Sequence, residues 1–317
     1  MVGVEREMMT VEELNAHIAD GSVNEIIRIA EAKQVKYLSR IADEITSKSR
    51  LRLVLVTGAS AAGKTTTAKR ICTQLMVNGC SAAMHLSTDD YFVGDALNPR
   101  DENGNLDYEH VECVDIPRLA SDVNALLRGE KVPRRRFDFV KHEPFYTDEQ
   151  VTLPESGMIV LEGIHALNPR LTEGIDDEMK FRVFIEPVPE IDVFGGFTPS
   201  PADARFLRRM VRDNQFRKRN PSDTVRLWPN VRAGEAKWID PFRQNADAAF
   251  NSYLVYELAA LKPYVGGLLE RARRELGEDR LLVKLIRILD TVEPISPEVI
   301  PGDSILRETI GGSQLEY

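Results

Sequence analysis

An apolar run that ends in a glycine-rich turn, LRLVLVTGASAAGKTTT at residues 51–67, constrains the fold more than any other part of the sequence. Residues 51–56 have the continuous apolar character of a parallel strand that is buried on both faces. Residues 65–77 have helical spacing, and Asn78 and Gly79 then predict the helix end. A strand, a glycine-rich turn and a helix in this order begin a parallel α/β sheet.

The turn itself fits the pattern GxxxxGK[ST]. Its glycines let backbone N–H groups converge on phosphate oxygens, Lys64 bridges the β- and γ-phosphates, and the Thr65 hydroxyl holds Mg²⁺. We therefore predict a nucleoside triphosphate, with ATP as the phosphate donor, and Mg²⁺. The predicted nucleotide-binding residues are Gly58, Ala59, Ser60, Ala61, Ala62, Gly63, Lys64, Thr65 and Thr66.

The turn alone does not separate a kinase from a GTPase switch or an ATPase motor. The sequence has no guanine-reading NKxD and no LSGGQ. A DxxG match at residues 101–104 lies in a turn-forming run with no strand before it, so we interpret it as chance.

Acidic residues follow the other predicted strands. Residues 82–87 end at Asp89 and Asp90, residues 158–161 end at Glu162, and residues 181–185 form a fourth strand. Apolar strands that alternate with helices predict a three-layer α/β P-loop fold, with a parallel sheet and the site at the carboxyl ends of the strands. A carboxylate there orients or deprotonates an attacking hydroxyl, and Glu162 is a candidate metal ligand with Thr65.

Charge, cysteine content and the lack of long apolar runs limit the partners and the cellular compartment that we expect for this protein. The 317-residue chain has a net charge of −9, which disfavours broad binding to nucleic acid. Three cysteines, Cys72, Cys80 and Cys113, fit no metal or disulfide pattern and are interpreted as packing residues. No apolar run approaches the roughly 20 residues that cross a bilayer. We expect a cytoplasmic protein without a membrane partner, and a homo-oligomer stays open.

Four segments together resemble the uridine kinase branch of the phosphoribulokinase and uridine kinase family. They are GASAAGKTTTA, STDDYF, LEGIHAL and DARFLRRMVRD, and the resemblance covers about residues 51–255. It implies that Asp89 is the catalytic base, that Asp90 is only its neighbour, and that Tyr91 lies with the substrate. It also implies that Asp107 binds the ribose, with His142 facing the base and Phe139 as an apolar wall. Phe137 stands where that branch usually has tyrosine.

An arginine-rich helix follows the sheet. Arg205, Arg208, Arg209 and Arg212 share one helical face, as expected for a helical lid at about residues 203–220 that closes over a triphosphate. We predict that Arg208 and Arg212 contact phosphates, and that Arg205 and Arg217 contact substrate. A solvated face or an RNA contact are the alternatives.

The predicted organisation has three parts: a helical lead at residues 1–50, a P-loop kinase domain at 51–260, and a helical extension and tail at 261–317. Two loop-rich stretches, residues 94–110 and 133–150, should shape the substrate site. The predicted reaction transfers phosphate from ATP to the 5′-hydroxyl of a nucleoside, uridine or cytidine. Another small alcohol, such as a sugar phosphate or a pantothenate-like acceptor, and a non-catalytic nucleotide-binding regulator remain alternatives.

Overall fold

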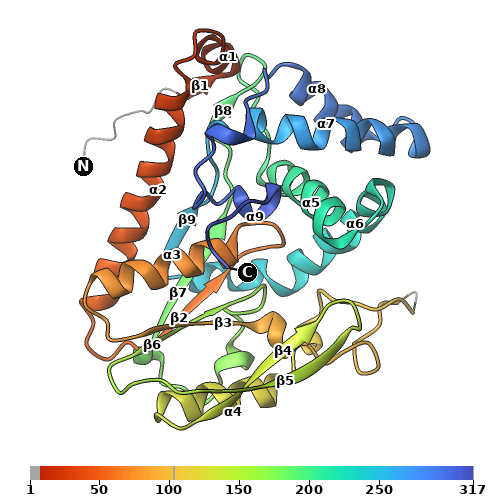
Figure 1. Ribbon diagram of the computed structural model, residues 1–317. Helices are drawn as coiled ribbons and strands as arrows, with labels where there is room; N and C mark the ends of the chain where they lie inside the picture. The colour runs from red at the N-terminus through yellow and green to blue at the C-terminus, as the bar shows by residue number, and fades with distance from the viewer. Residues whose placement is uncertain (1–7, 103, 317) are drawn as a thin grey trace.

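The computed structural model describes residues 8–102 and 104–316, and its centre is a parallel sheet (Figure 1). All neighbouring strands of this sheet are parallel. Their order is β3 (Ala83–Ser87), β6 (Met158–Glu162), β2 (Leu53–Thr57), β7 (Lys180–Glu186) and β9 (Ala248–Asn251). The predicted three-layer α/β P-loop fold with a parallel sheet is confirmed.

Both faces of β2 are buried, which explains its uninterrupted apolar sequence. Val54 and Val56 join the larger hydrophobic cluster, which includes α2 (Val23–Thr46) and α3 (Lys64–Val77). Leu53 and Leu55 point the other way, into a second cluster that includes α4 (Ile116–Leu127). Helices therefore cover the two opposite faces of the sheet.

The described part of the N-terminal lead, residues 8–50, is mainly helical, as the sequence predicts. Helix α1 (Val11–Ala19) begins with a capping box between Thr10 and Glu13, and α2 follows it. The short strand β1 (Met9–Thr10) pairs in parallel with β8 (Ile191–Asp192), which ties this lead to the segment after β7. Buried residues of α2, such as Leu38 and Ile45, belong to the same cluster as the central sheet.

The stretch at 133–150 is a hairpin, so the prediction of a loop there is wrong. Strands β4 (Val132–Asp138) and β5 (Glu143–Val151) pair antiparallel, with an irregular register between Pro133 and Arg135. The arginines of β4 obscure the alternation of apolar and polar residues that would predict a strand. Arg135 occupies a buried position of this strand because it pairs with Asp115. Residues 94–102 and 104–110 form turns, bends and irregular backbone with one isolated bridge between Arg100 and Leu106, as expected for a loop-rich stretch.

The C-terminal half adds helices on one side of the sheet, where Figure 1 shows α5 to α8 close together. They are α5 (Pro201–Arg217), α6 (Pro221–Trp238), α7 (Glu257–Leu276) and α8 (Arg280–Asp290). Helix α7 runs into the segment expected as a helical extension and tail, residues 261–317, and α8 lies within it. The expected domain boundary at 260/261 falls inside α7, which packs into the main cluster.

The tail returns to the middle of the molecule, where α9 (Arg307–Ile310) packs against α5. The 3-10 helices are η1 (Thr88–Tyr91), η2 (Val111–Cys113), η3 (Pro169–Thr172), η4 (Asp177–Met179), η5 (Asp240–Asn245) and η6 (Pro297–Val299). Cys72, Cys80 and Cys113 are free thiols that pack against the hydrophobic clusters. Among the helices of residues 8–102 and 104–316, none has both the length and the apolarity needed for a membrane crossing.

Candidate active site

The glycine-rich turn joins β2 to α3, and all nine predicted nucleotide-binding residues lie in it or in the first turn of α3. Gly63 has φ +87°, a conformation that favours glycine. A Cβ atom at Gly58 would lie 2.3 Å from the carbonyl oxygen of Ile185, so only glycine fits there. Lys64 Nζ donates to the carbonyl of Ala59 at 3.3 Å, so the lysine folds back over its own turn.

The ends of β3 and β6 and the first turn of α3 meet at Glu162. Its Oε1 accepts from the Thr65 hydroxyl at 3.1 Å and from the Ser87 hydroxyl at 2.9 Å. The side chain is buried, and this burial, followed by the nearby charge of Asp89, raises the pKa of Glu162 to about 7. The end of β6 therefore brings the phosphate loop and the end of β3 together around one carboxylate.

Asp89 and Asp90 lie in η1, directly after β3. The negative charge of Asp89 raises the pKa of Glu162 and also acts to raise the pKa of Arg217. Asp90 instead pairs with Arg136 of β4 at 2.7 Å, and burial raises its pKa. Asp90 is therefore held by an ion pair with the hairpin, and the catalytic role of Asp89 stays a prediction.

Two of the predicted phosphate or substrate contacts on α5 are buried ion pairs. Arg208 is 2% exposed and binds Glu257 through Nε and Nη2, each at 2.6 Å. Arg205 is equally buried, and its Nη2 donates to both oxygens of Glu235 at 2.7 Å. Both guanidinium groups are thus paired inside the protein, and the ligand contacts predicted for these two arginines stay predictions.

Both buried arginines support the phosphate loop from behind. Arg208 Nη2 donates to the carbonyl of Ser252 at 2.9 Å, and the Ser252 hydroxyl donates to the carbonyl of Ala62 at 2.7 Å. Arg205 Nη1 reaches the carbonyl of Ser60 at 3.3 Å. These contacts hold the backbone of the turn in the shape that phosphate binding needs.

The arginines that face the loop from α5 are Arg209 and Arg212. Their guanidinium groups donate to the Ser60 hydroxyl at 2.8 and 3.4 Å. Both also pair with Asp213, whose side chain is fully buried and which Arg217 and Arg219 approach as well. Burial would raise the pKa of Asp213, but the four cations outweigh it and hold this pKa below its usual value. Asp213 therefore gathers four positive charges beside the loop.

Tyr91 lies in the core and not at the substrate side. Its ring is 4% exposed, its hydroxyl donates to Asp122 of α4 at 3.1 Å, and the Arg135 guanidinium stacks on it. The η1 turn points this side chain inward under the hairpin, which corrects the predicted substrate contact.

The other predicted substrate residues border one region between the 94–110 turns and the hairpin. Phe137 is almost buried, and its ring meets the edges of Phe92 and the exposed Phe139 at centroid distances of 5.5 and 5.2 Å. His142, with φ +56°, lies 3.3 Å from both Asp95 Oδ1 and the Tyr108 hydroxyl. The Asp107 carboxylate accepts from the amide of Glu109.

The sequence interpretation missed Glu109. One of its carboxylate oxygens is buried without a hydrogen-bond partner among the described residues, and burial raises its pKa while Arg209 and Lys64 oppose that shift. Glu109 lies two residues after Asp107, and this closeness to a predicted substrate residue could have identified it as a candidate site residue. Arg209 and Asp213 were also missed as loop-side residues, because a shared helical face does not show which side chain reaches the loop.

Comparisons with known proteins identify the family of this chain. The model of the phosphoribulokinase/uridine kinase family matches residues 53–259. A uridine kinase of Deinococcus deserti is 29% identical over 204 residues, which cover 64% of this chain and 88% of that protein. A uridine kinase of Halobacterium salinarum is 28% identical over 193 residues, covering 61% and 76%.

A solved structure described as a possible uridine kinase from Bacillus stearothermophilus aligns with a TM-score of 0.45 and 20% identity, over 69% of this chain and 98% of that one. A parallel sheet with a phosphate loop after β2 and a carboxylate at the end of β6 defines a P-loop nucleotide-binding protein, and the family match narrows this class to the phosphotransferases. The chain belongs to the phosphoribulokinase/uridine kinase family.

Proposed function

We propose that this protein transfers the γ-phosphate of ATP to the 5′-hydroxyl of a nucleoside, uridine or cytidine. The observation that carries the proposal is the meeting of Thr65, in the first turn of α3, with Ser87 and Glu162 at the ends of β3 and β6. Asp89, whose amide donates to the same Ser87 hydroxyl at 3.3 Å, supplies the carboxylate that would activate an alcohol.

The phosphate side is pre-organised. Backbone amides of the loop and Lys64 hold the triphosphate. Arg209 and Arg212 reach the loop from α5 through the Ser60 hydroxyl, and they neutralise charge on the transferring group. Arg208 acts through Ser252 by holding the loop, and so is a positioning residue.

The residues present fit Mg²⁺ bound to a nucleotide. Two hydroxyl groups and a buried carboxylate converge, and the raised pKa of Glu162 is the property of a buried carboxylate that a cation would stabilise. No group of three or more His, Cys, Asp or Glu side chains suited to a metal occurs among residues 8–102 and 104–316. Mg²⁺ usually uses one or two carboxylates together with phosphates and water. When bound, it neutralises charge on the phosphate oxygens.

On the acceptor side, Asp89 accepts the proton of the 5′-hydroxyl as the bond to phosphorus forms. Asp107 binds the ribose hydroxyls, and the aromatic cluster of Phe92, Phe137 and Phe139 provides an apolar wall for the base. His142 faces the base edge. Phenylalanine at 137 offers no hydroxyl to the base, so its preference between pyrimidines depends on other contacts.

ADP release with ATP and Mg²⁺ across a panel of nucleosides, phosphorylated sugars and pantothenate tests the proposal. We expect stimulation by uridine or cytidine and a 5′-monophosphate as product. Stimulation only by a phosphorylated sugar or by pantothenate overturns the nucleoside assignment. ATP binding without transfer to any acceptor favours a regulator.

A further inference from the structure

A carboxylate from the C-terminal tail is bound to the phosphate-binding end of α3. Glu308 Oε2 accepts from the backbone amide of Thr66 at 3.2 Å and from the Thr66 hydroxyl at 2.6 Å. Glu308 belongs to α9, 242 residues further along the chain and outside the part that the family model matches. This contact therefore brings an element beyond the family domain into the phosphate site.

The donors that Glu308 uses are of the kind that binds phosphate. Helix α3 begins at Lys64, so the amide of Thr66 lies in the first turn, where N–H groups have no partner within the helix. These amides and the positive end of the helix dipole attract anions. A carboxylate on the Thr66 amide and hydroxyl thus takes a position that suits an oxygen of a bound phosphate.

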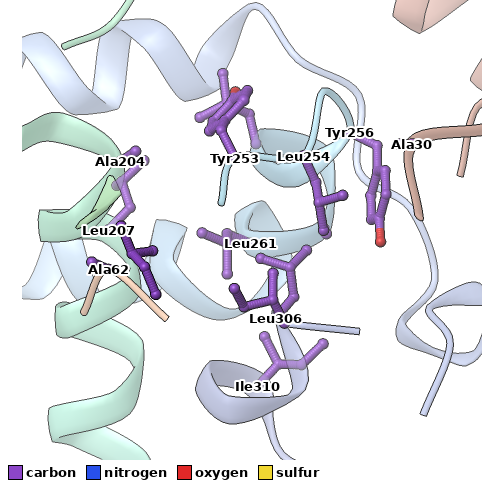
Figure 2. Close-up of a cluster of buried hydrophobic side chains, with 14 of the residues drawn as sticks. Ala30, Ala62, Ala204, Leu207, Tyr253, Leu254, Tyr256, Leu261, Leu306 and Ile310 are labelled. Carbon is purple, nitrogen blue, oxygen red and sulfur yellow. The ribbon is translucent and has the colours of Figure 1, made fainter. Parts of the chain in front are cut away.

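The tail backbone beneath Glu308 is firmly anchored. Ile305, Leu306 and Ile310 are buried in the main hydrophobic cluster. Figure 2 shows Leu306 and Ile310 in one buried group with Ala62 of the phosphate loop, Leu207 of α5 and Leu261 of α7.

One further contact joins this segment to the loop, and another stabilises the tail itself. A Cβ at Gly63 would lie 2.4 Å from Ile305 Cδ1, so the tail touches the loop directly. The Arg307 guanidinium donates to the carbonyls of Pro297 and Pro301 and so holds the tail together. The Glu308 side chain is only half-buried, so it can turn away while the backbone stays in place.

We propose that Glu308 is a built-in competitor for a phosphate group of the nucleotide, which must displace the Glu308 carboxylate from Thr66 to bind fully. The proposal rests on the proposed function, because it assumes that the glycine-rich turn binds a triphosphate. It assigns to the tail a direct effect on nucleotide affinity. The rival explanation is that Glu308 is a permanent cap of α3 and stays in place when nucleotide binds.

Binding of ATP and of inorganic tripolyphosphate, measured by calorimetry, separates the two explanations. The variants are Glu308→Gln, which removes the charge, and Glu308→Ala, which also removes the acceptor. Glu298→Gln is the matched control, because Glu298 is an exposed carboxylate of the same tail. Competition predicts that both Glu308 variants bind ATP and tripolyphosphate about three- to tenfold more tightly, since a charge-assisted hydrogen bond is no longer displaced. The control should bind as the wild type does.

Thermal unfolding gives a second readout. It compares the rise in melting temperature that ATP causes in each protein, so it remains useful if the variants are less stable than the wild type. Loss of the Glu308 contact should lower the melting temperature without ligand, and saturating ATP should then raise it by more than in the wild type. If Glu308→Gln binds ATP as tightly as the wild type or more weakly, Glu308 does not compete with the nucleotide. Glu308 is then a permanent cap of α3. If neither the wild type nor any variant binds ATP or tripolyphosphate, the proposed function fails as well.

Discussion

The proposed phosphate half and the proposed acceptor half of the site are built in different ways. In the phosphate half, which comprises residues 58–66, Glu162 and α5, ionisable groups are buried and hydrogen-bonded: Arg208 is 2% exposed and Glu162 3%. In the acceptor half, which comprises the 94–110 turns and the β4–β5 hairpin, Phe139 is 55% exposed. The His142 side chain is 43% exposed.

This difference shows where each property of the enzyme resides. Buried pairs fix the loop before any ligand arrives, so changes there should affect the catalytic rate and the folding stability together. Exposed aromatic and imidazole groups gain burial only when an acceptor binds. Changes in the acceptor half should therefore alter acceptor affinity and leave folding intact.

The largest expected effect lies where the two halves meet. Asp89→Asn should lower kcat by about 100- to 10,000-fold, because the 5′-hydroxyl loses its proton acceptor. ATP binding should be unchanged, as calorimetry can show. Asp90→Asn is the matched control: its carboxylate is paired with Arg136, so we expect less than a tenfold loss. Equal losses in the two variants would contradict the assignment of the base to Asp89.

The strands and the phosphate loop were predictable because their signals are local. The apolar runs of β2, β3, β6 and β7 and the glycines at 58 and 63 determine backbone shape directly. The acidic residues at the strand ends followed from the rule that such ends meet at one edge of a parallel sheet.

The partners of the arginines were not predictable, because they come from distant parts of the chain. Helical periodicity placed Arg205 and Arg208 on one face but could not show Glu235 of α6 or Glu257 of α7 packed against it. The same holds for the hairpin, where burial of Arg135 depends on Asp115, and for Glu308 at the loop.

The second prediction separates support from contact within α5. Arg208→Met should lower the free energy of unfolding by about 3–5 kcal/mol, because Glu257 is left buried and unpaired. Arg212→Met should cost far less stability but should lower kcat, because Arg212 is partly exposed beside Ser60. Urea unfolding and initial rates measure the two quantities. A stable Arg208→Met with slow turnover would instead support a direct phosphate contact for Arg208.

The third prediction concerns pH and the buried carboxylate of the phosphate half. The pKa of Glu162 is raised from 4.5 to about 7, so the folded state holds a proton that the unfolded state releases between these pH values. The contribution of Glu162 to stability should therefore fall as pH rises from about 4.5 to about 7, by up to about 3 kcal/mol, and stay constant above that.

Urea unfolding of the ligand-free wild type and of Glu162→Gln across this pH range measures the effect as a difference. Glutamine has no proton to lose, so the variant should gain on the wild type as pH rises. Parallel stability curves for the two proteins would show that Glu162 titrates at its ordinary pKa.

The smallest effect should be found on the exposed acceptor half, at His142. His142→Asn is the suitable change, because asparagine tolerates the positive φ of this position while its side chain is shorter. We expect the KM for the nucleoside to rise about three- to tenfold, as for one lost hydrogen bond, with kcat and the KM for ATP unchanged. Val140→Ala, at a 91% exposed position of the same turn, should have no effect. A fall in kcat for His142→Asn, with the KM for the nucleoside unchanged, would assign His142 to the phosphate half. The proposed division of the site into a phosphate half and an acceptor half would then be wrong.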